Sequence, residues 1–137
     1  MKGYGLRVLV ADNRHDTRVA VSELLTEAEY NVHFARDVVE VCRQLISRRY
    51  DVIVASDQFP GLNSLEFLTL GQALCPQTPI VVIAYAKSER AQVALRRGAH
   101  AWISTPHESD AVCKAVHSAV MQKDPQHAGA ATVHVSG

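Results

Sequence analysis

Short apolar segments alternate along this chain with longer amphipathic segments, and this alternation constrains the fold more than any other feature. The apolar segments are residues 7–11, 52–55, 80–84 and 101–103, and the first of them is apolar after its initial Arg7. Runs of this kind are typical of strands that are buried on both faces of a sheet. The amphipathic segments carry apolar side chains at helical spacing, as in Val21, Leu24, Leu25 and Ala28.

The remaining elements follow from the same patterns. Residues 30–34 alternate apolar and polar side chains, which indicates a strand at the edge of the sheet. Helices are predicted over residues 15–28, 37–48, 63–74, 87–97 and 108–122. Asp37 and Asn63 are suited to cap the second and third of these helices, and Gly98 is suited to end the fourth.

Five strands and five helices in strict alternation predict an α/β fold with a doubly wound parallel sheet. Right-handed crossovers then place helices on both faces of that sheet. Because the second strand has the pattern of an edge strand, the order 2-1-3-4-5 is favoured over the order 3-2-1-4-5-6. One domain is expected over residues 1–122, and a Pro-, Gly-, Ala- and His-containing tail or linker over 123–137.

The charge balance excludes some classes of function. The chain has 14 Lys and Arg and 14 Asp and Glu, so it does not bind nucleic acid through bulk positive charge. No apolar run is long enough for a membrane span, and the amino terminus lacks the form of a signal peptide. Cys42, Cys75 and Cys113 are widely spaced and odd in number, which favours reduced thiols in the cytoplasm.

Residues that could carry chemistry follow the predicted strands, because the functional crevice of such sheets lies at the carboxyl ends of the strands. They are Asp12 and Asn13, Ser56 and Asp57, Ala84 and Tyr85, and Thr105 and Pro106. No glycine-rich phosphate loop follows the first strand, and an enzyme with a small substrate is the least favoured class of function.

At these positions the sequence resembles the receiver domain of two-component response regulators. The resemblance covers roughly residues 5–122. It depends on six motifs in order, at 7–12, 50–54, 60–66, 79–83, 98–99 and 105–106. It implies a flavodoxin-like (βα)5 fold. It also implies a phosphoryl transfer onto an aspartate that ends the third strand, with a magnesium-binding acidic pair, a hydroxyl and a lysine as helpers.

The chain departs from that set of residues at most positions. The position of the phosphoacceptor aspartate, four residues before Pro60, is occupied by Ser56, and Asn13 stands for one of the acidic pair. Ala84 replaces the hydroxyl residue and Thr105 the lysine, while Asp12 is retained. A serine has no carboxylate with which to form an acyl phosphate.

We therefore expect a vestigial pocket without catalytic residues, metal or cofactor, lined by Asp12, Asn13, Ser56, Asp57, Ala84, Thr105 and Pro106. Asp57 leaves an alternative open. It lies one position after Ser56, so it is expected on the opposite face of the strand as a solvated or helix-capping carboxylate. A bulge at the strand end would instead turn it into the pocket as a phosphoacceptor.

The expected function is phosphorylation-independent binding to protein partners of a signalling pathway. Trp102 is interpreted either as a tryptophan that packs over an exposed edge of the sheet or as a surface aromatic that anchors a partner, next to Tyr85. A small-residue stripe on the fifth helix is ordinarily part of the core. It would also allow close approach of a second copy, in a homodimer through the fourth helix, fifth strand and fifth helix. The stripe is Ala111, Ala115 and Ala119. A working phosphoacceptor and the regulatory domain of a longer protein stay open as alternatives.

Two further residue groups have ordinary explanations. The seven histidines form no metal-binding motif and are expected as scattered surface residues. The pairs Arg48–Arg49 and Arg96–Arg97 lie at predicted helix ends, where they complement the helix dipole. Because no aromatic residue is interleaved with either pair, a nucleic-acid patch is disfavoured.

Overall fold

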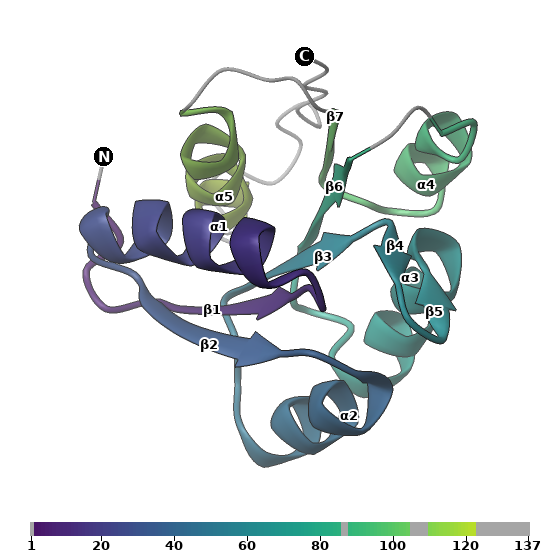
Figure 1. Ribbon diagram of the computed structural model, residues 1–137, viewed down its shortest axis with the longest axis horizontal. Helices are drawn as coiled ribbons and strands as arrows, with labels where there is room; N and C mark the ends of the chain where they lie inside the picture. The colour runs from purple at the N-terminus through teal and green to yellow at the C-terminus, as the bar shows by residue number, and fades with distance from the viewer. Residues whose placement is uncertain (1, 86–87, 105–109, 123–137) are drawn as a thin grey trace.

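A single five-stranded parallel sheet forms the centre of the molecule, as the computed structural model of residues 2–85, 88–104 and 110–122 describes it (Figure 1). Its strands are β2, β1, β3, β6 and β7 in spatial order. Their bounds are β1 Arg7–Ala11, β2 Asn31–Ala35, β3 Val52–Ser56, β6 Ile80–Ala84 and β7 Ala101–Ser104. The predicted doubly wound α/β fold with strand order 2-1-3-4-5 is confirmed.

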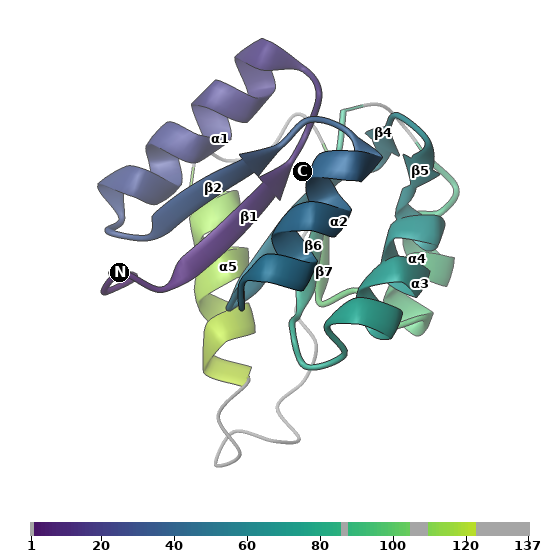
Figure 2. The same ribbon diagram turned by 90° about the horizontal axis from the view of Figure 1, so that it is seen from below.

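Helices cover both faces of the sheet. The five helices are α1 His15–Glu27, α2 Val38–Ser47, α3 Ser64–Leu74, α4 Ala91–Arg96 and α5 Ala111–Gln122. Figures 1 and 2 show α1 and α5 on one face of the sheet and α2 and α3 on the other. Successive side chains of a strand point to opposite faces of the sheet, so each strand contributes to both helix layers. In β1, Leu9 packs toward α2 and α3, whereas Val8 and Val10 pack toward α1 and α5.

Local sequence signals set the helix ends where they were expected. The Asp37 side chain accepts a hydrogen bond from the backbone N–H of Glu40 at the start of α2. Asn63 and Glu66 form a reciprocal capping box at the start of α3. Gly98 has a φ of 106°, the left-handed conformation that ends α4.

The structure differs from the sequence prediction in two places. Helix α4 begins at Ala91 rather than near residue 87. The turn at Pro60 and Gly61 is a small antiparallel hairpin of β4 (Gln58–Phe59) and β5 (Leu62–Asn63). Gly61 has a φ of 81°, which only glycine adopts readily, so the hairpin closes tightly between β3 and α3.

Candidate functional site

The carboxyl ends of three neighbouring strands bring the candidate pocket residues to one edge of the sheet. In the strand register Ala11 of β1 pairs with Ala55 of β3, and Ser56 pairs with Ile83 of β6. Asp12, Ser56, Asp57 and Ala84 therefore lie at the same level, and each is at most 3% exposed. Asn13 is exposed, and Thr105 and Pro106 lie outside the described residues.

The Asp12 carboxylate accepts hydrogen bonds from residues at the start of α1. Its Oδ1 atom accepts a hydrogen bond from the backbone N–H of Arg14 at 2.9 Å, and its Oδ2 atom accepts one from the Thr17 hydroxyl at 2.8 Å. The Arg18 guanidinium donates to the backbone carbonyl of Asp12 at 3.2 Å. Both carboxylate oxygens of Asp12 are thus already used as acceptors within the protein.

Tyr85 follows Ala84 and lies half-buried at the same edge. The Arg14 guanidinium carbon is 5.1 Å from the centre of the Tyr85 ring, which is cation–π geometry. Burial, and then the negative charge of Asp12, raise the pKa of Tyr85 well above its ordinary value, so its phenol is neutral. A bulky neutral ring under an arginine therefore lies next to Ala84, which supplies no hydroxyl.

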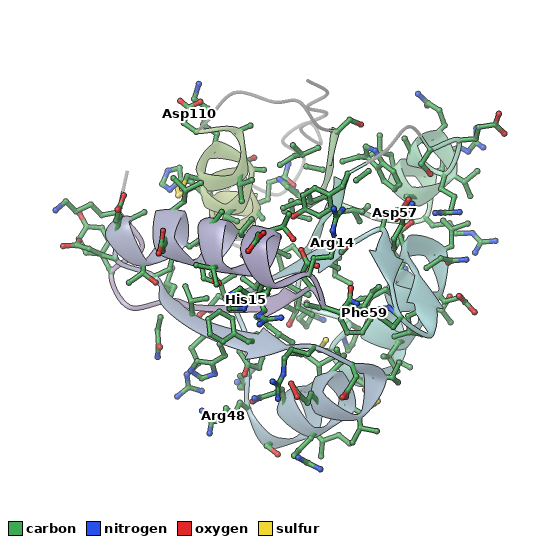
Figure 3. The ribbon with its side chains drawn as sticks, in the orientation of Figure 1. Arg14, His15, Arg48, Asp57, Phe59 and Asp110 are labelled. Atoms are coloured by element: carbon green, nitrogen blue, oxygen red, sulfur yellow. The ribbon has the colours of Figure 1, made fainter. Side chains whose placement is uncertain are left out.

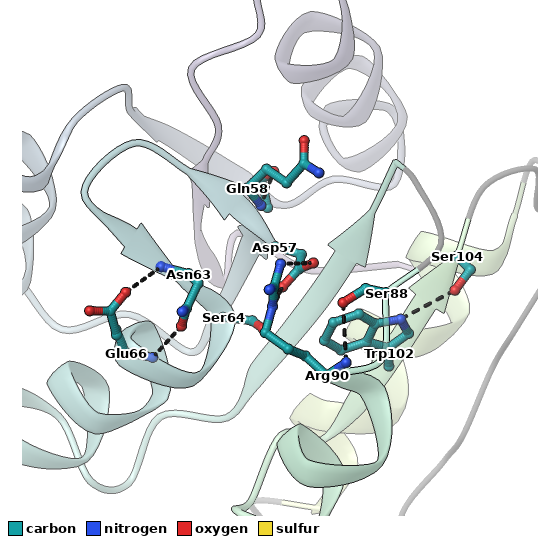
Figure 4. Close-up of polar contacts among 10 residues, drawn as sticks. Asp57, Gln58, Asn63, Ser64, Glu66, Ser88, Arg90, Trp102 and Ser104 are labelled. Atoms are coloured by element: carbon teal, nitrogen blue, oxygen red, sulfur yellow. Dashed lines mark hydrogen bonds and ion pairs between the residues drawn. The ribbon is translucent and has the colours of Figure 1, made fainter.

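Asp57 is buried and forms an ion pair with Arg90, the residue before α4 (Figure 4). Arg90 donates from Nε to Oδ1 at 2.8 Å and from Nη2 to Oδ2 at 2.7 Å. The Ser64 hydroxyl at the start of α3 donates to Oδ1 at 2.6 Å. The interpretation of Asp57 as a solvated or capping carboxylate is wrong, because its side chain is 2% exposed and binds α3 and α4.

The environment of Asp57 favours its charged form. Burial alone raises the pKa of the carboxyl group, but the hydrogen bonds from Arg90 and Ser64 outweigh burial and lower the pKa below its ordinary value. The same bidentate contact raises the pKa of Arg90. Asp57 continues the face of Ala55, toward α3 and α4, and so does not share the orientation of its neighbour Ser56.

Magnesium, which the receiver fold implies at this edge, does not fit the residues present. Divalent magnesium favours carboxylate oxygens with open coordination positions. Asp12 offers one carboxylate, whose oxygens are engaged by Arg14 and Thr17, and the neighbouring Arg18 adds positive charge. Within residues 2–85, 88–104 and 110–122, no three His, Cys, Asp or Glu side chains are grouped to hold a metal ion.

The predicted interface residues are mostly core residues. Trp102 is 1% exposed and belongs to the core on the sheet face that α2, α3 and α4 cover, while its indole N–H donates to the Ser104 hydroxyl at 3.2 Å. The interpretation of Trp102 as a surface anchor is therefore wrong. The small-residue stripe is also buried, because it packs α5 tightly onto the sheet; its members are Ala111, Ala115 and Ala119.

Sequence reasoning missed Arg90 and Ser64. Arg90 lies inside the segment predicted as helix, where an arginine is ordinarily a solvated residue. Ser64 follows a recognised cap and carries no signal of its own. The one available signal was the adjacent Asp57, because a carboxylate at the end of a buried strand needs a cation or a hydrogen-bond donor if it is itself buried.

A doubly wound five-stranded domain with Asp12 after β1 and Asp57 after β3 has a flavodoxin-like architecture, with polar residues at the carboxyl ends of its strands. The chain belongs to the response regulator receiver domain family, whose profile matches residues 8–117. The family acts in two-component signalling. The resemblance stated from the motifs is thereby confirmed.

Curated relatives agree with this family. The nitrogen assimilation regulatory protein NtrX of Azorhizobium caulinodans is 28% identical over 75% of this chain and 23% of its own length. A protein-glutamate methylesterase/protein-glutamine glutaminase of Thermotoga maritima is 31% identical over 76% of this chain and 31% of its own length. The chain thus spans less than a third of the length of either relative.

Solved receiver structures share the fold. A response regulator receiver domain protein from Clostridium thermocellum is 19% identical, with a TM-score of 0.80 over 86% of this chain and 96% of that one. The beryllofluoride-activated NtrC4 receiver domain dimer is 21% identical, with a TM-score of 0.79 over 85% of this chain and 98% of that one. Among the described residues, no helix is both long and apolar enough to cross a membrane.

Proposed function

We propose that this receiver domain transmits signals by binding protein partners and does not accept a phosphoryl group. The observation that carries the proposal is the bidentate contact of Arg90 with both oxygens of Asp57, beside a serine at the acceptor position. The domain then works as a binding module of the cytoplasm and not as an enzyme.

The chemistry of the acyl phosphate supports this proposal. A carboxylate oxygen must attack the phosphorus atom of the donor, and the bond between phosphorus and the donor's leaving group breaks as the new O–P bond forms. The attacking oxygen then bridges the carboxyl carbon and phosphorus in a mixed anhydride. Ser56 has no carboxylate, and its hydroxyl accepts a hydrogen bond from the backbone N–H of Gln58 at 3.3 Å. An attack by Asp57 would have to break its contacts with Arg90, and with Ser64 where Oδ1 is the attacking atom.

The helpers of phosphoryl transfer are replaced by internal contacts. Arg90 supplies positive charge to Asp57, but it does so inside an ion pair. The carboxylate of Asp12 is engaged by Arg14 and Thr17. Each buried carboxylate at this edge therefore has internal partners, which favours one persistent conformation over a phosphate-dependent switch.

Incubation with acetyl phosphate and magnesium tests the proposal. We expect no adduct of about 80 Da, the mass of an added phosphoryl group, by intact-mass spectrometry. An active receiver treated in parallel is the positive control. A hydroxylamine-sensitive adduct that disappears in Asp57→Asn but persists in Ser56→Ala would overturn the proposal and establish Asp57 as the acceptor.

Phosphorylation of Asp57 is the second candidate function. One observation favours it: Asp57 lies immediately after β3, within one residue of the acceptor position. The third alternative, a regulatory domain of a longer protein, is supported by the small share of NtrX and of the methylesterase that this chain covers. Sequencing the native gene to its stop codon distinguishes it from a domain that acts alone.

Homodimerisation through α4, β7 and α5 remains our proposal for the self-association of this domain, by analogy with the NtrC4 receiver domain dimer. Since Trp102 and the alanine stripe are buried, such a dimer must use other side chains, for example exposed Gln92, Arg96 and Lys114. Sedimentation equilibrium of the intact chain tests this, and a monomer at all concentrations would contradict it.

A further inference from the structure

We propose that a groove at the amino ends of β1 and β3 binds a small phosphorylated ligand that carries a planar ring, of the mononucleotide class. The groove has a volume of about 710 Å³, within the range of small-molecule sites. It lies between three segments, residues 4–7, 45–51 and 74–78. Figure 3 shows Arg48 of this region at the opposite end of the sheet from Asp57, so the groove is separate from the receiver pocket.

Three arginines make the groove positive. Arg7, Arg48 and Arg49 line it, against the single carboxylate of Asp51. The Oδ2 atom of Asp51 accepts a hydrogen bond from the backbone N–H of Arg7 at 2.8 Å, and the Arg7 guanidinium donates to the carbonyl of Arg49 at 3.5 Å. A guanidinium group can donate two parallel hydrogen bonds to the oxygens of one phosphate. The excess of positive charge in this groove therefore fits a phosphate.

The two neighbouring guanidinium groups are available to such a ligand. Arg48 and Arg49 are exposed, and in the part of the chain that the structure describes their side chains form no hydrogen bond or ion pair. Arg7 and Arg48 are near enough to His33 to contribute, after burial, to a lowered pKa of its ring. Positive charge from separate segments thus gathers at this end of the sheet.

An aromatic side chain and an apolar floor accompany the charge. Tyr4 is 82% exposed and lies in the left-handed conformation, with a φ of 50°. Its turn is fixed by hydrogen bonds from the backbone N–H groups of Gly3 and Gly5 to the carbonyls of Ala28 and Glu29, at 2.6 and 2.8 Å. Strained, exposed residues held in this way are common at ligand sites.

The floor suits a planar ring. Leu45 and Tyr50 are buried beneath the groove, and Leu74 is 38% exposed at its side. A ring that stacks on Tyr4 and rests on these side chains would place its phosphate toward the arginines. The sequence alone separated the aromatic Tyr4 from the pair Arg48–Arg49 by more than forty residues, and only the fold brings them to one groove.

The helix dipole explains only part of this arrangement. Arg48 and Arg49 follow the carboxyl end of α2, where positive charge is favourable without a ligand. Arg7 and Tyr4 belong to a different segment and have no such reason to be there. The limited volume favours a small ligand over a nucleic-acid strand.

Calorimetric titration of the full chain with ADP, with inorganic pyrophosphate and with adenosine tests the proposal. We expect saturable binding of ADP and a loss of about tenfold or more in Arg48→Gln/Arg49→Gln, because charge-assisted hydrogen bonds disappear. Tyr4→Ala should weaken the binding of ADP but leave the affinity for pyrophosphate unchanged. The control Arg96→Gln/Arg97→Gln removes two exposed arginines outside the groove and should bind ADP normally.

Three outcomes of the binding measurements would overturn the proposal. They are the absence of saturable ADP binding, an equal loss in the Arg96→Gln/Arg97→Gln control, and tighter binding of a single-stranded oligouridylate than of ADP. Amide chemical shifts in the same titration locate the ligand. Changes confined to the receiver pocket near Asp57 would also contradict it. Since the variants leave Asp57 and Arg90 untouched, failure here does not affect the proposed binding function.

Discussion

Both oxygens of the Asp57 carboxylate accept hydrogen bonds from the Arg90 guanidinium, at 2.8 and 2.7 Å, and this contact ties the end of β3 to the start of α4. Asp57 is buried, whereas the Arg90 side chain is 36% exposed. Ser64 adds a third hydrogen bond from α3. The end of β3 and the starts of α3 and α4 are therefore held together at one carboxylate.

Arg90→Ala should destabilise the domain, because it leaves a buried carboxylate without its cation. We expect a free energy of unfolding lower by about 3 kcal/mol, the low end for a broken buried ion pair since Arg90 is partly exposed. Urea unfolding followed by circular dichroism measures this. Arg96→Ala on the exposed end of α4 is the matched control, with an expected change within about 0.5 kcal/mol. Equal losses in the two variants would show that the ion pair contributes no special stability.

Trp102 is the single tryptophan of the chain and is buried between β7 and the helices of one face. Its fluorescence should be blue-shifted relative to free tryptophan and poorly quenched by acrylamide. Trp102→Ala should cost about 3–5 kcal/mol, as large core truncations do. Strong quenching in the folded wild-type protein would contradict the buried position and restore a surface role.

Stability should decrease as the pH falls below about 6.5, the ordinary pKa of histidine. Burial lowers the pKa of His100, whose Nε2 atom lies 3.1 Å from the Ser118 hydroxyl, and burial also lowers that of His33. The unfolded chain therefore binds protons that the folded state rejects, so the free energy of unfolding rises with pH in this range.

Thermal unfolding at a series of pH values, with His100→Gln as the test variant, measures this dependence. The variant should have a flatter pH profile whatever its absolute stability, with His33 responsible for part of the remaining slope. Ser47→Ala, at an exposed position at the end of α2, removes no titratable group; it is the control and should keep the wild-type profile. An unchanged slope in His100→Gln would exclude His100 as a source.

Asn63→Ala should lower the free energy of unfolding by about 1 kcal/mol, because the helix cap is lost. Asn63 Oδ1 accepts a hydrogen bond from the Glu66 backbone N–H at 2.9 Å, and the Glu66 carboxylate accepts one from the Asn63 backbone N–H. Asn63→Asp keeps an acceptor and should be nearly neutral, as denaturant unfolding would measure. Equal effects of the two substitutions would argue against capping.

Much of the fold could be predicted from the sequence because it depends on local patterns. Apolar runs predicted four strands of the central sheet and an alternating pattern predicted the edge strand β2, and the caps Asp37 and Asn63 act where they were expected. The helix of residues 87–97 was predicted too long at its start, since no cap marks where α4 begins. The candidate pocket was predicted as a set of strand ends, but the partners of Asp57 were not.

The sequence by itself determined the family, the order of the strands and the residues that follow each strand. Only the tertiary structure decided that Asp57 is paired with Arg90, that Trp102 is core, and that Tyr4 lies in one groove with Arg48. The physical reason is the separation along the chain over which each kind of interaction acts. Hydrophobic period and capping act within a few residues, whereas ion pairing, burial and cavity formation depend on which distant segments the packed sheet brings into contact.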